Sequence, residues 1–257
     1  MYKLRDIILE RPVNPKALIL AGSPGAGKSS FIEDIDNALI LNVDDYYIRD
    51  LKNADAEARS KAASAMAAAN KEFRPFMKDI ILGKKNFILD GTAANSGPTL
   101  RLKKELEDLG YDIMMVYVFA SLEKALDRNE TRFQRTQGED RSLPPALVMR
   151  TWNNITQNYD LYKNEFGNNF ISVVNDKALT KGATQKSLED LVKTYVDPYK
   201  PTDTKPKTDK QQQRSDKQKA ETNKQITDFI NSEKVEDIKT NSISKDEAKT
   251  KVKQFFL

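Results

Sequence analysis

The chain has 257 residues, of which 39% are hydrophobic and 31% charged, with a formal net charge of +4. It contains no cysteine and no histidine, which excludes disulfides, thiolate or imidazole metal sites and histidine catalysis. Acid–base chemistry would therefore fall to Asp, Glu, Lys or Tyr, and a bound metal would be an oxygen-liking ion such as Mg²⁺. No apolar run approaches the roughly 18 residues that span a bilayer, and the N-terminus lacks a signal-peptide core, so we expect a cytoplasmic protein without a membrane partner.

Five short apolar runs predict strands that are buried on both faces of a sheet. They cover 17–21, 39–43, 86–89, 113–119 and 170–174. Between them, apolar residues at helical spacing predict helices, the last of which would begin at Pro145. These helices cover 30–35, 100–109, 121–133 and 145–166. The regular alternation predicts right-handed crossovers and hence a three-layer α/β sandwich around a five-stranded parallel sheet.

Two further segments are expected within a domain at 1–197. An insertion at 52–84 is Ala-rich and then aromatic, which predicts a helical pair broken near Pro75 that would cover the substrate. A segment at 133–144 lies between two predicted helices and is expected to form a lid.

The composition changes beyond Tyr199. The stretch from Lys200 to Gln225 contains no Val, Ile, Leu, Met, Phe or Trp, so 198–225 is predicted to be a disordered basic linker. The last part, 226–257, regains an apolar face after a capping-box sequence at Ser244. We expect a short helical element there, which either docks on a partner protein or frays as a tail.

A phosphate-binding loop follows the first predicted strand. Gly22 to Ser29 fits the pattern GxxxxGK[ST] without a mismatch, and a helix is predicted after it, which disfavours a chance match to a glycine-rich turn. The glycines let backbone N–H groups converge on a phosphate, Lys28 would reach the β- and γ-phosphates, and the Ser29 hydroxyl would hold Mg²⁺. The residues predicted to bind ATP are Gly22, Ser23, Pro24, Gly25, Ala26, Gly27, Lys28, Ser29 and Ser30.

Carboxylates follow the second and third predicted strands, at the edge of the sheet where ligands bind. Asp44 is predicted to be the general base that takes the proton of an attacking hydroxyl, with Asp45 as the second candidate. Asp90 and Thr92 would orient the substrate, or Asp90 would bind Mg²⁺ through water. The alternative is that these residues only cap turns.

Two arginines four residues apart lie on one face of a predicted helix. Arg128 and Arg132 would stabilise the negative charge that phosphoryl transfer spreads over three oxygens. The alternative is a solvated basic helix face.

These motifs, taken in order, resemble those of the zeta-toxin-like kinases and of the kinase domain of phage polynucleotide 5′-kinase. The resemblance covers roughly residues 16–180 and rests on the P-loop, Asn42–Tyr46, Asp90–Thr92 and Arg128–Arg132. It implies that Asp44 is the general base, that Lys28 and Ser29 bind ATP and Mg²⁺, and that the arginines clamp phosphates. Zeta toxins usually carry Glu where Asp90 stands, and polynucleotide kinases carry Arg where Tyr47 stands.

The sequence therefore predicts an ATP-dependent phosphotransferase that phosphorylates a hydroxyl of a small molecule or nucleotide sugar. One alternative is a polynucleotide 5′-hydroxyl kinase, which the residue Tyr47 and the lack of aromatic residues among the tail's lysines disfavour. The other is a non-catalytic ATP-binding protein, which would need neither Asp44 nor the arginines.

Overall fold

The computed structural model describes residues 14–32, 35–46, 62–135, 143–176, 187–198 and 208–257. All five predicted strands are present and form one parallel sheet in the order β2-β3-β1-β4-β5. The strands are β1 (Lys16–Ala21), β2 (Leu39–Leu41), β3 (Phe87–Asp90), β4 (Asp112–Phe119) and β5 (Phe170–Val174). The central strands β1 and β4 are buried almost throughout, as continuous apolar runs predict, and the α/β sandwich is confirmed.

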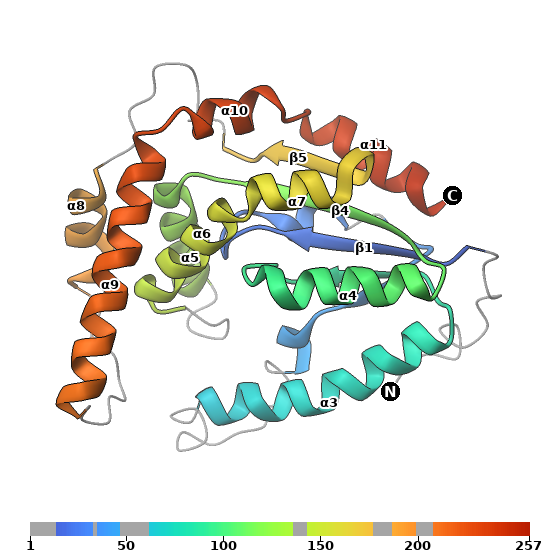
Figure 1. Cartoon of the computed structure of the whole chain (residues 1–257), viewed down its shortest axis with the longest axis horizontal. Helices are drawn as coiled ribbons and strands as arrows, with labels where there is room; N and C mark the ends of the chain where they lie inside the picture. Colours follow the sequence, from blue (N-terminus) through green and yellow to red (C-terminus); the bar gives the residue numbers. More distant parts are fainter. Residues whose placement is uncertain (1–13, 33–34, 47–61, 136–142, 177–186, 199–207) are drawn as a thin grey trace.

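Most of the helices between the strands pack on one face of this sheet (Figure 1). They are α3 (Ala62–Leu82), α4 (Ser96–Asp108), α5 (Leu122–Arg135), α6 (Pro145–Gln157) and α7 (Tyr159–Phe166), followed by the 3-10 turn η3 (Gly167–Asn169). The core on this face includes Trp152 of α6, whose indole N–H donates to the carbonyl oxygen of Ala120 at 2.8 Å.

Three helix predictions need correction. Helix α3 runs unbroken through Pro75, because Phe73, Ile80 and Ile81 anchor its second half in the core; residues 52–61 of the predicted insertion lie outside the described residues. The helix expected at 145–166 is divided at Asn158, whose side-chain amide donates to the carbonyl oxygen of Ala94 at 3.2 Å. After the P-loop only the 3-10 turn η2 (Lys28–Phe31) is described.

The predicted disordered linker is wrong for most of its length. Helix α8 (Leu188–Leu191) and the π-turn η4 (Val192–Val196) precede α9 (Asp209–Ile230), which lies along α6 in Figure 1; residues 199–207 lie outside the description. Helix α9 starts with a capping box at Thr208 and is anchored at its far end by Phe229, whose ring is 5.3 Å from that of Trp152. Its first half carries no apolar anchor and is exposed.

The C-terminal element packs on its own domain rather than fraying or waiting for a partner. Helix α10 (Lys234–Thr240) is followed by Ile243, whose N–H donates to the carbonyl oxygen of Ser172 at 2.9 Å and extends the edge of β5. Helix α11 (Lys245–Phe256) then covers the second face of the sheet. On this face the strands contribute Leu18, Leu20, Ile88 and Val116 to a second core cluster. The residues that pack against them from η2 and α11 include Phe31, Ala248, Val252 and Phe256. The tail therefore supplies part of the third layer.

Among the described residues, no helix combines the length and the apolar character that crossing a membrane requires.

Candidate active site

The glycine-rich loop after β1 has the shape of a phosphate cradle. The N–H of Gly22 donates to the carbonyl oxygen of Thr92 at 3.1 Å, which ties the loop to the end of β3. Gly25 and Gly27 have φ of 78° and 86°, values that L side chains rarely adopt. A Cβ at Gly25 would collide with the backbone of Ala125, and one at Gly27 with the amide of Asn175. Both positions therefore require glycine.

Lys28 folds back over this loop. Its ammonium donates to the carbonyl oxygens of Gly22 and Ser23, both at 3.1 Å. Burial lowers the pKa of the Lys28 ammonium, while the carboxylates of Asp90 and Asp44 act in the opposite direction. The lysine thus lies within the electrostatic reach of both predicted carboxylates.

The two serines after the lysine differ in surroundings. The side chain of Ser29, the predicted Mg²⁺ ligand, is exposed. The hydroxyl of Ser30 donates to the carbonyl oxygen of Gly27 at 2.8 Å, so its side chain closes the loop. Only the backbone N–H of Ser30 remains as the group that would meet a phosphate.

Arg128 supports the loop from behind, which sequence analysis did not foresee. Its guanidinium donates to the carbonyl oxygens of Gly25 at 3.0 Å, Ala26 at 3.2 Å and Asn175 at 2.9 Å. The side-chain amide of Asn175 also donates to the carbonyl oxygen of Ala26, at 2.7 Å. In this structure the Arg128 guanidinium therefore binds the loop's carbonyl groups, whereas the sequence placed it on the phosphates.

The pair Asn175–Asp176, directly after β5, connects the P-loop with the start of α5. Asn175 braces the loop as described, and the carboxylate of Asp176 accepts a hydrogen bond from the hydroxyl of Ser121 at 2.5 Å. Asp176 also accepts from the Ser121 N–H at 3.2 Å, directly before α5 begins. It therefore fixes the start of the helix that carries Arg128.

The ends of β2 and β3 bring the predicted carboxylates together. Asn42 follows β2, and its side-chain amide donates to Oδ2 of Asp90 at 3.1 Å. Its Oδ1 accepts from the N–H of Asp44 at 2.8 Å, and residues 43–46 form a helical turn. Thr92 holds its own turn, because its hydroxyl accepts from the N–H of Ala94 at 3.4 Å. Asn42 is a site residue that the sequence analysis did not single out.

The charges of this cluster act on one another. Burial raises the pKa of the Asp90 carboxyl, the charges of Asp44 and Asp45 raise it further, and Lys28 and Arg132 oppose this effect. Burial and the neighbouring charge of Asp44 also raise the pKa of Asp45. Arg132 is exposed on α5 and close enough to influence both Lys28 and Asp90. Lys28, Asp44, Asp90 and Arg132 thus form one electrostatic site.

Helix α3 borders this site through aromatic contacts. The ring of Tyr46 lies 5.9 Å from that of Phe73, edge to face, and 6.4 Å from that of Phe76. Because Tyr46 follows Asp44 and Asp45 directly, the inserted helix lies against the acidic turn. Tyr47 and most of the predicted lid (136–142) lie outside the described residues.

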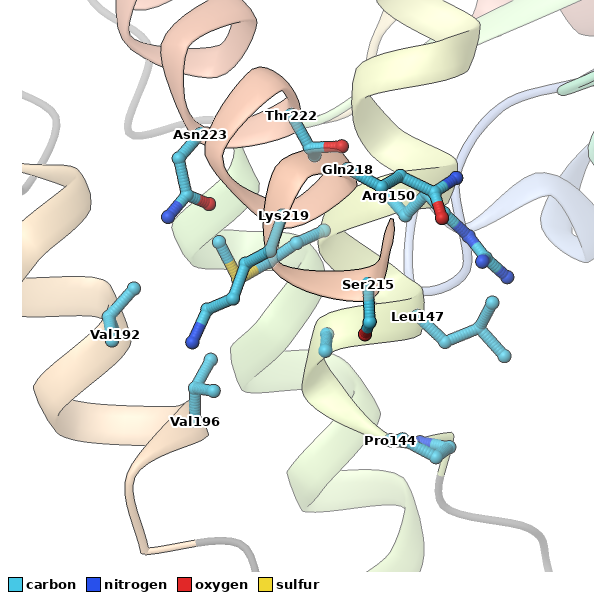
Figure 2. Close-up of a pocket in the computed structure, with 12 residues that line it drawn as sticks. Pro144, Leu147, Arg150, Val192, Val196, Ser215, Gln218, Lys219, Thr222 and Asn223 are labelled. Atoms are coloured by element: carbon cyan, nitrogen blue, oxygen red, sulfur yellow. The ribbon is translucent and has the colours of Figure 1, made fainter. Parts of the chain in front are cut away.

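A separate groove of about 340 Å³ lies between α6, η4 and α9 (Figure 2). Its lining residues include Leu147, Arg150, Val196 and Lys219. No lining residue comes from the P-loop or the ends of β2 and β3, so this groove is distinct from the candidate active site.

Comparison with known proteins identifies a family and similar folds. The Zeta toxin family model matches residues 3–187. Similar solved structures include one from a study of the PezAT chromosomal toxin-antitoxin system of Streptococcus pneumoniae, with TM-score 0.50 and 13% identity, covering 88% of this chain and 91% of that one.

The AvrRxo1-ORF1:AvrRxo1-ORF2 structure with sulphate ions has TM-score 0.52 and 13% identity, covering 94% of this chain and 81% of that one. The structure of AvrRxo1-ORF1:-ORF2 with ATP has TM-score 0.51 and 12% identity, with the same coverage. At such identities these likenesses show the fold, and a comparison with curated proteins found no match. Because the family match covers more than half of the chain, this protein belongs to the Zeta toxin family.

Proposed function

We propose that the protein is an ATP- and Mg²⁺-dependent kinase that moves the γ-phosphate of ATP to a hydroxyl of a small molecule, such as a nucleotide sugar. The observation that carries the proposal is the joint electrostatic site of Lys28, Asp44 and Asp90 at the mouth of the phosphate-binding loop. A protein that only binds ATP would need the loop and the lysine, but not the partly buried carboxylates of Asp44 and Asp90 beside them.

The residues present fit MgATP. The N–H groups of the loop and the Lys28 ammonium would bind the β- and γ-phosphates, exchanging the lysine's bonds to Gly22 and Ser23 for bonds to phosphate oxygens. The exposed Ser29 hydroxyl would hold Mg²⁺, which supplies neutralisation of phosphate charge. Arg132 would approach from α5 and stabilise the charge that develops on the transferred group.

The chemical step needs a base next to the acceptor. The acceptor oxygen would bond to the γ-phosphorus as the bond between that phosphorus and the β,γ-bridging oxygen breaks, with ADP as the leaving group. Asp44 would take the proton of the acceptor hydroxyl. Asp45, Asp90 and Thr92 would line the acceptor side of the site. Tyr46 and helix α3, which contact each other, would border it.

The acceptor class can be identified by phosphate transfer from labelled ATP. Pools of nucleotide sugars, nucleosides and 5′-hydroxyl oligonucleotides are incubated separately with protein and Mg²⁺, and we expect label to enter the nucleotide-sugar or another small-molecule pool. Label in the oligonucleotides alone would favour a polynucleotide kinase. Tight MgATP binding with no transfer to any pool would contradict the proposed function and favour a binding protein.

A protein partner is also proposed for this chain. The similar structures come from studies of a toxin-antitoxin system and of a two-protein complex, which supports a partner that controls the kinase. The C-terminal element, for which docking on a partner was one of the two expectations, is packed on its own domain and does not support that particular role.

The two arginines of α5 are expected to respond differently to substitution by alanine. Arg128→Ala removes three hydrogen bonds to loop and strand-end carbonyl groups, so the free energy of unfolding should fall by about 2–3 kcal/mol and MgATP affinity should fall with it. Arg132→Ala, one turn away and exposed, should change unfolding by less than about 1 kcal/mol but lower kcat by about 10³-fold. Denaturant unfolding and single-turnover transfer measure the two effects. Equal stability of the two variants would contradict the role of Arg128 in supporting the loop.

A further inference from the structure

One side chain joins the two strand ends that carry the acidic groups. Asn42 uses both ends of its amide: Oδ1 accepts from the N–H of Asp44 at 2.8 Å, and Nδ2 donates to Oδ2 of Asp90 at 3.1 Å. The register explains this contact, because Leu41 of β2 pairs with Leu89 of β3 and the next residues are therefore neighbours. The amide bridges two segments that are 48 residues apart in the chain.

The chemistry of this position favours asparagine. An aspartate there could still accept from the Asp44 N–H, as a helix cap does, but it could not donate to Asp90. It would also add a fourth carboxylate to a cluster in which Asp44 and Asp45 already oppose ionisation of Asp90. A neutral side chain with a donor and an acceptor is the arrangement that holds two repelling carboxylates in register.

We propose that Asn42 is a positioning residue that fixes Asp44 and Asp90 relative to each other, so that both meet the same acceptor hydroxyl. This inference rests on the phosphotransfer function proposed above. Cap and bridge act together: the bond to Asp44 sets the turn that presents the base, and the bond to Asp90 locks that turn to β3. From there β3 is paired with β1, which leads into the phosphate-binding loop. The acceptor side of the site is thereby held in a fixed relation to the donor side.

The same sheet offers a matched control at the amino end of its strands. Asn86 precedes β3, and its Oδ1 accepts from the N–H of Lys16 at 2.9 Å while its Nδ2 donates to the carbonyl oxygen of Asn37 at 3.3 Å. It is also an asparagine that bridges neighbouring strands, but it lies away from the carboxyl edge that carries the P-loop. Asn86→Ala therefore shows what the loss of a purely structural bridge does.

The kinetic test compares Asn42→Ala, Asn42→Asp and Asn86→Ala. Both Asn42 variants should lower kcat for the acceptor on the order of 10²-fold, because the reacting groups are no longer held in place, while affinity for a fluorescent ATP analogue with Mg²⁺ stays within about twofold. Asn86→Ala should lower stability without this fall in kcat. Full turnover by Asn42→Asp, or an equal loss of kcat in Asn86→Ala, would overturn the proposal.

A second measurement does not depend on activity. The side-chain NH₂ signals of Asn42 in an NMR spectrum, assigned by their absence in Asn42→Asp, should move when Asp90 is replaced by alanine. Amide exchange at Asp44 should be faster in Asn42→Ala than in the wild type and protected in Asn42→Asp. If the wild type phosphorylates no acceptor, the proposed function fails. If the Asn42 NH₂ signals do not move when Asp90 is replaced by alanine, the hydrogen bond between the two side chains is absent and this inference is overturned.

Discussion

Replacing Asp44 with asparagine is expected to lower phosphate transfer by about 10³-fold or more. The amide has nearly the shape of the carboxylate but cannot accept the proton of the acceptor hydroxyl, and positioned general bases contribute on the order of 10²–10⁴-fold to rate. MgATP affinity should remain within a few fold, because the loop and Lys28 bind the phosphates. Single-turnover transfer and equilibrium binding of a fluorescent ATP analogue separate the two quantities.

Two variants serve as comparisons for Asp44→Asn. Asp45→Asn changes the same residue type one position along, and we expect a much smaller loss, because the charge of Asp44 acts on both Lys28 and Asp90, whereas Asp45 is exposed. Lys28→Ala should lower both affinity and transfer, since it removes a cation from the phosphate site. Full turnover by Asp44→Asn together with an inactive Asp45→Asn would move the base to Asp45.

The parts of the site that could be predicted depend on residues that are contiguous in the sequence. The P-loop pattern and the apolar runs of β1 to β5 are contiguous, and strand ends of a parallel sheet meet at one edge, so Lys28, Asp44 and Asp90 could be brought together in advance. The roles of Arg128 and Asn175 could not, because their contacts with Gly25 and Ala26 span 103 and 149 residues of sequence. The spacing of two arginines four positions apart on a helix predicts that they share a face, but it does not predict which groups each arginine binds.

The tail shows a different reason for a wrong prediction. The stretch without large apolar residues ends at Gln225, and the buried anchors Ile226 and Phe229 follow it directly. A composition rule applied to the stretch alone finds nothing to bury, whereas the helix that continues through it is held by its last turns and by its N-terminal cap. The signals that could have found it were the Thr208–Gln211 capping box and the helical spacing from Ile226 onward.

Removal of the last two helices is expected to unfold the protein, although the family match ends at residue 187. A chain ending at Ser232 lacks four large buried side chains: Val235, Ile238, Val252 and Phe256. At about 1.5–3 kcal/mol for each, their burial contributes about 6–12 kcal/mol, which is comparable with the total stability of a typical domain, about 5–15 kcal/mol. Circular dichroism and denaturant unfolding of the shortened chain should show no cooperative transition.

Point variants at the end of α11 separate specific packing from a general effect of shortening. Phe256 is buried on the sheet face with Phe31 and Val252, whereas its neighbour Phe255 is only partly buried. Phe256→Ala should therefore cost about 3–5 kcal/mol of unfolding free energy, and Phe255→Ala clearly less. Helix α11 also lies against η2, with the Lys245 ammonium 5.6 Å from the Phe31 ring centre, so loosening it should weaken MgATP binding as well. A Phe256→Ala protein as stable as the wild type would mean that α11 does not form this layer.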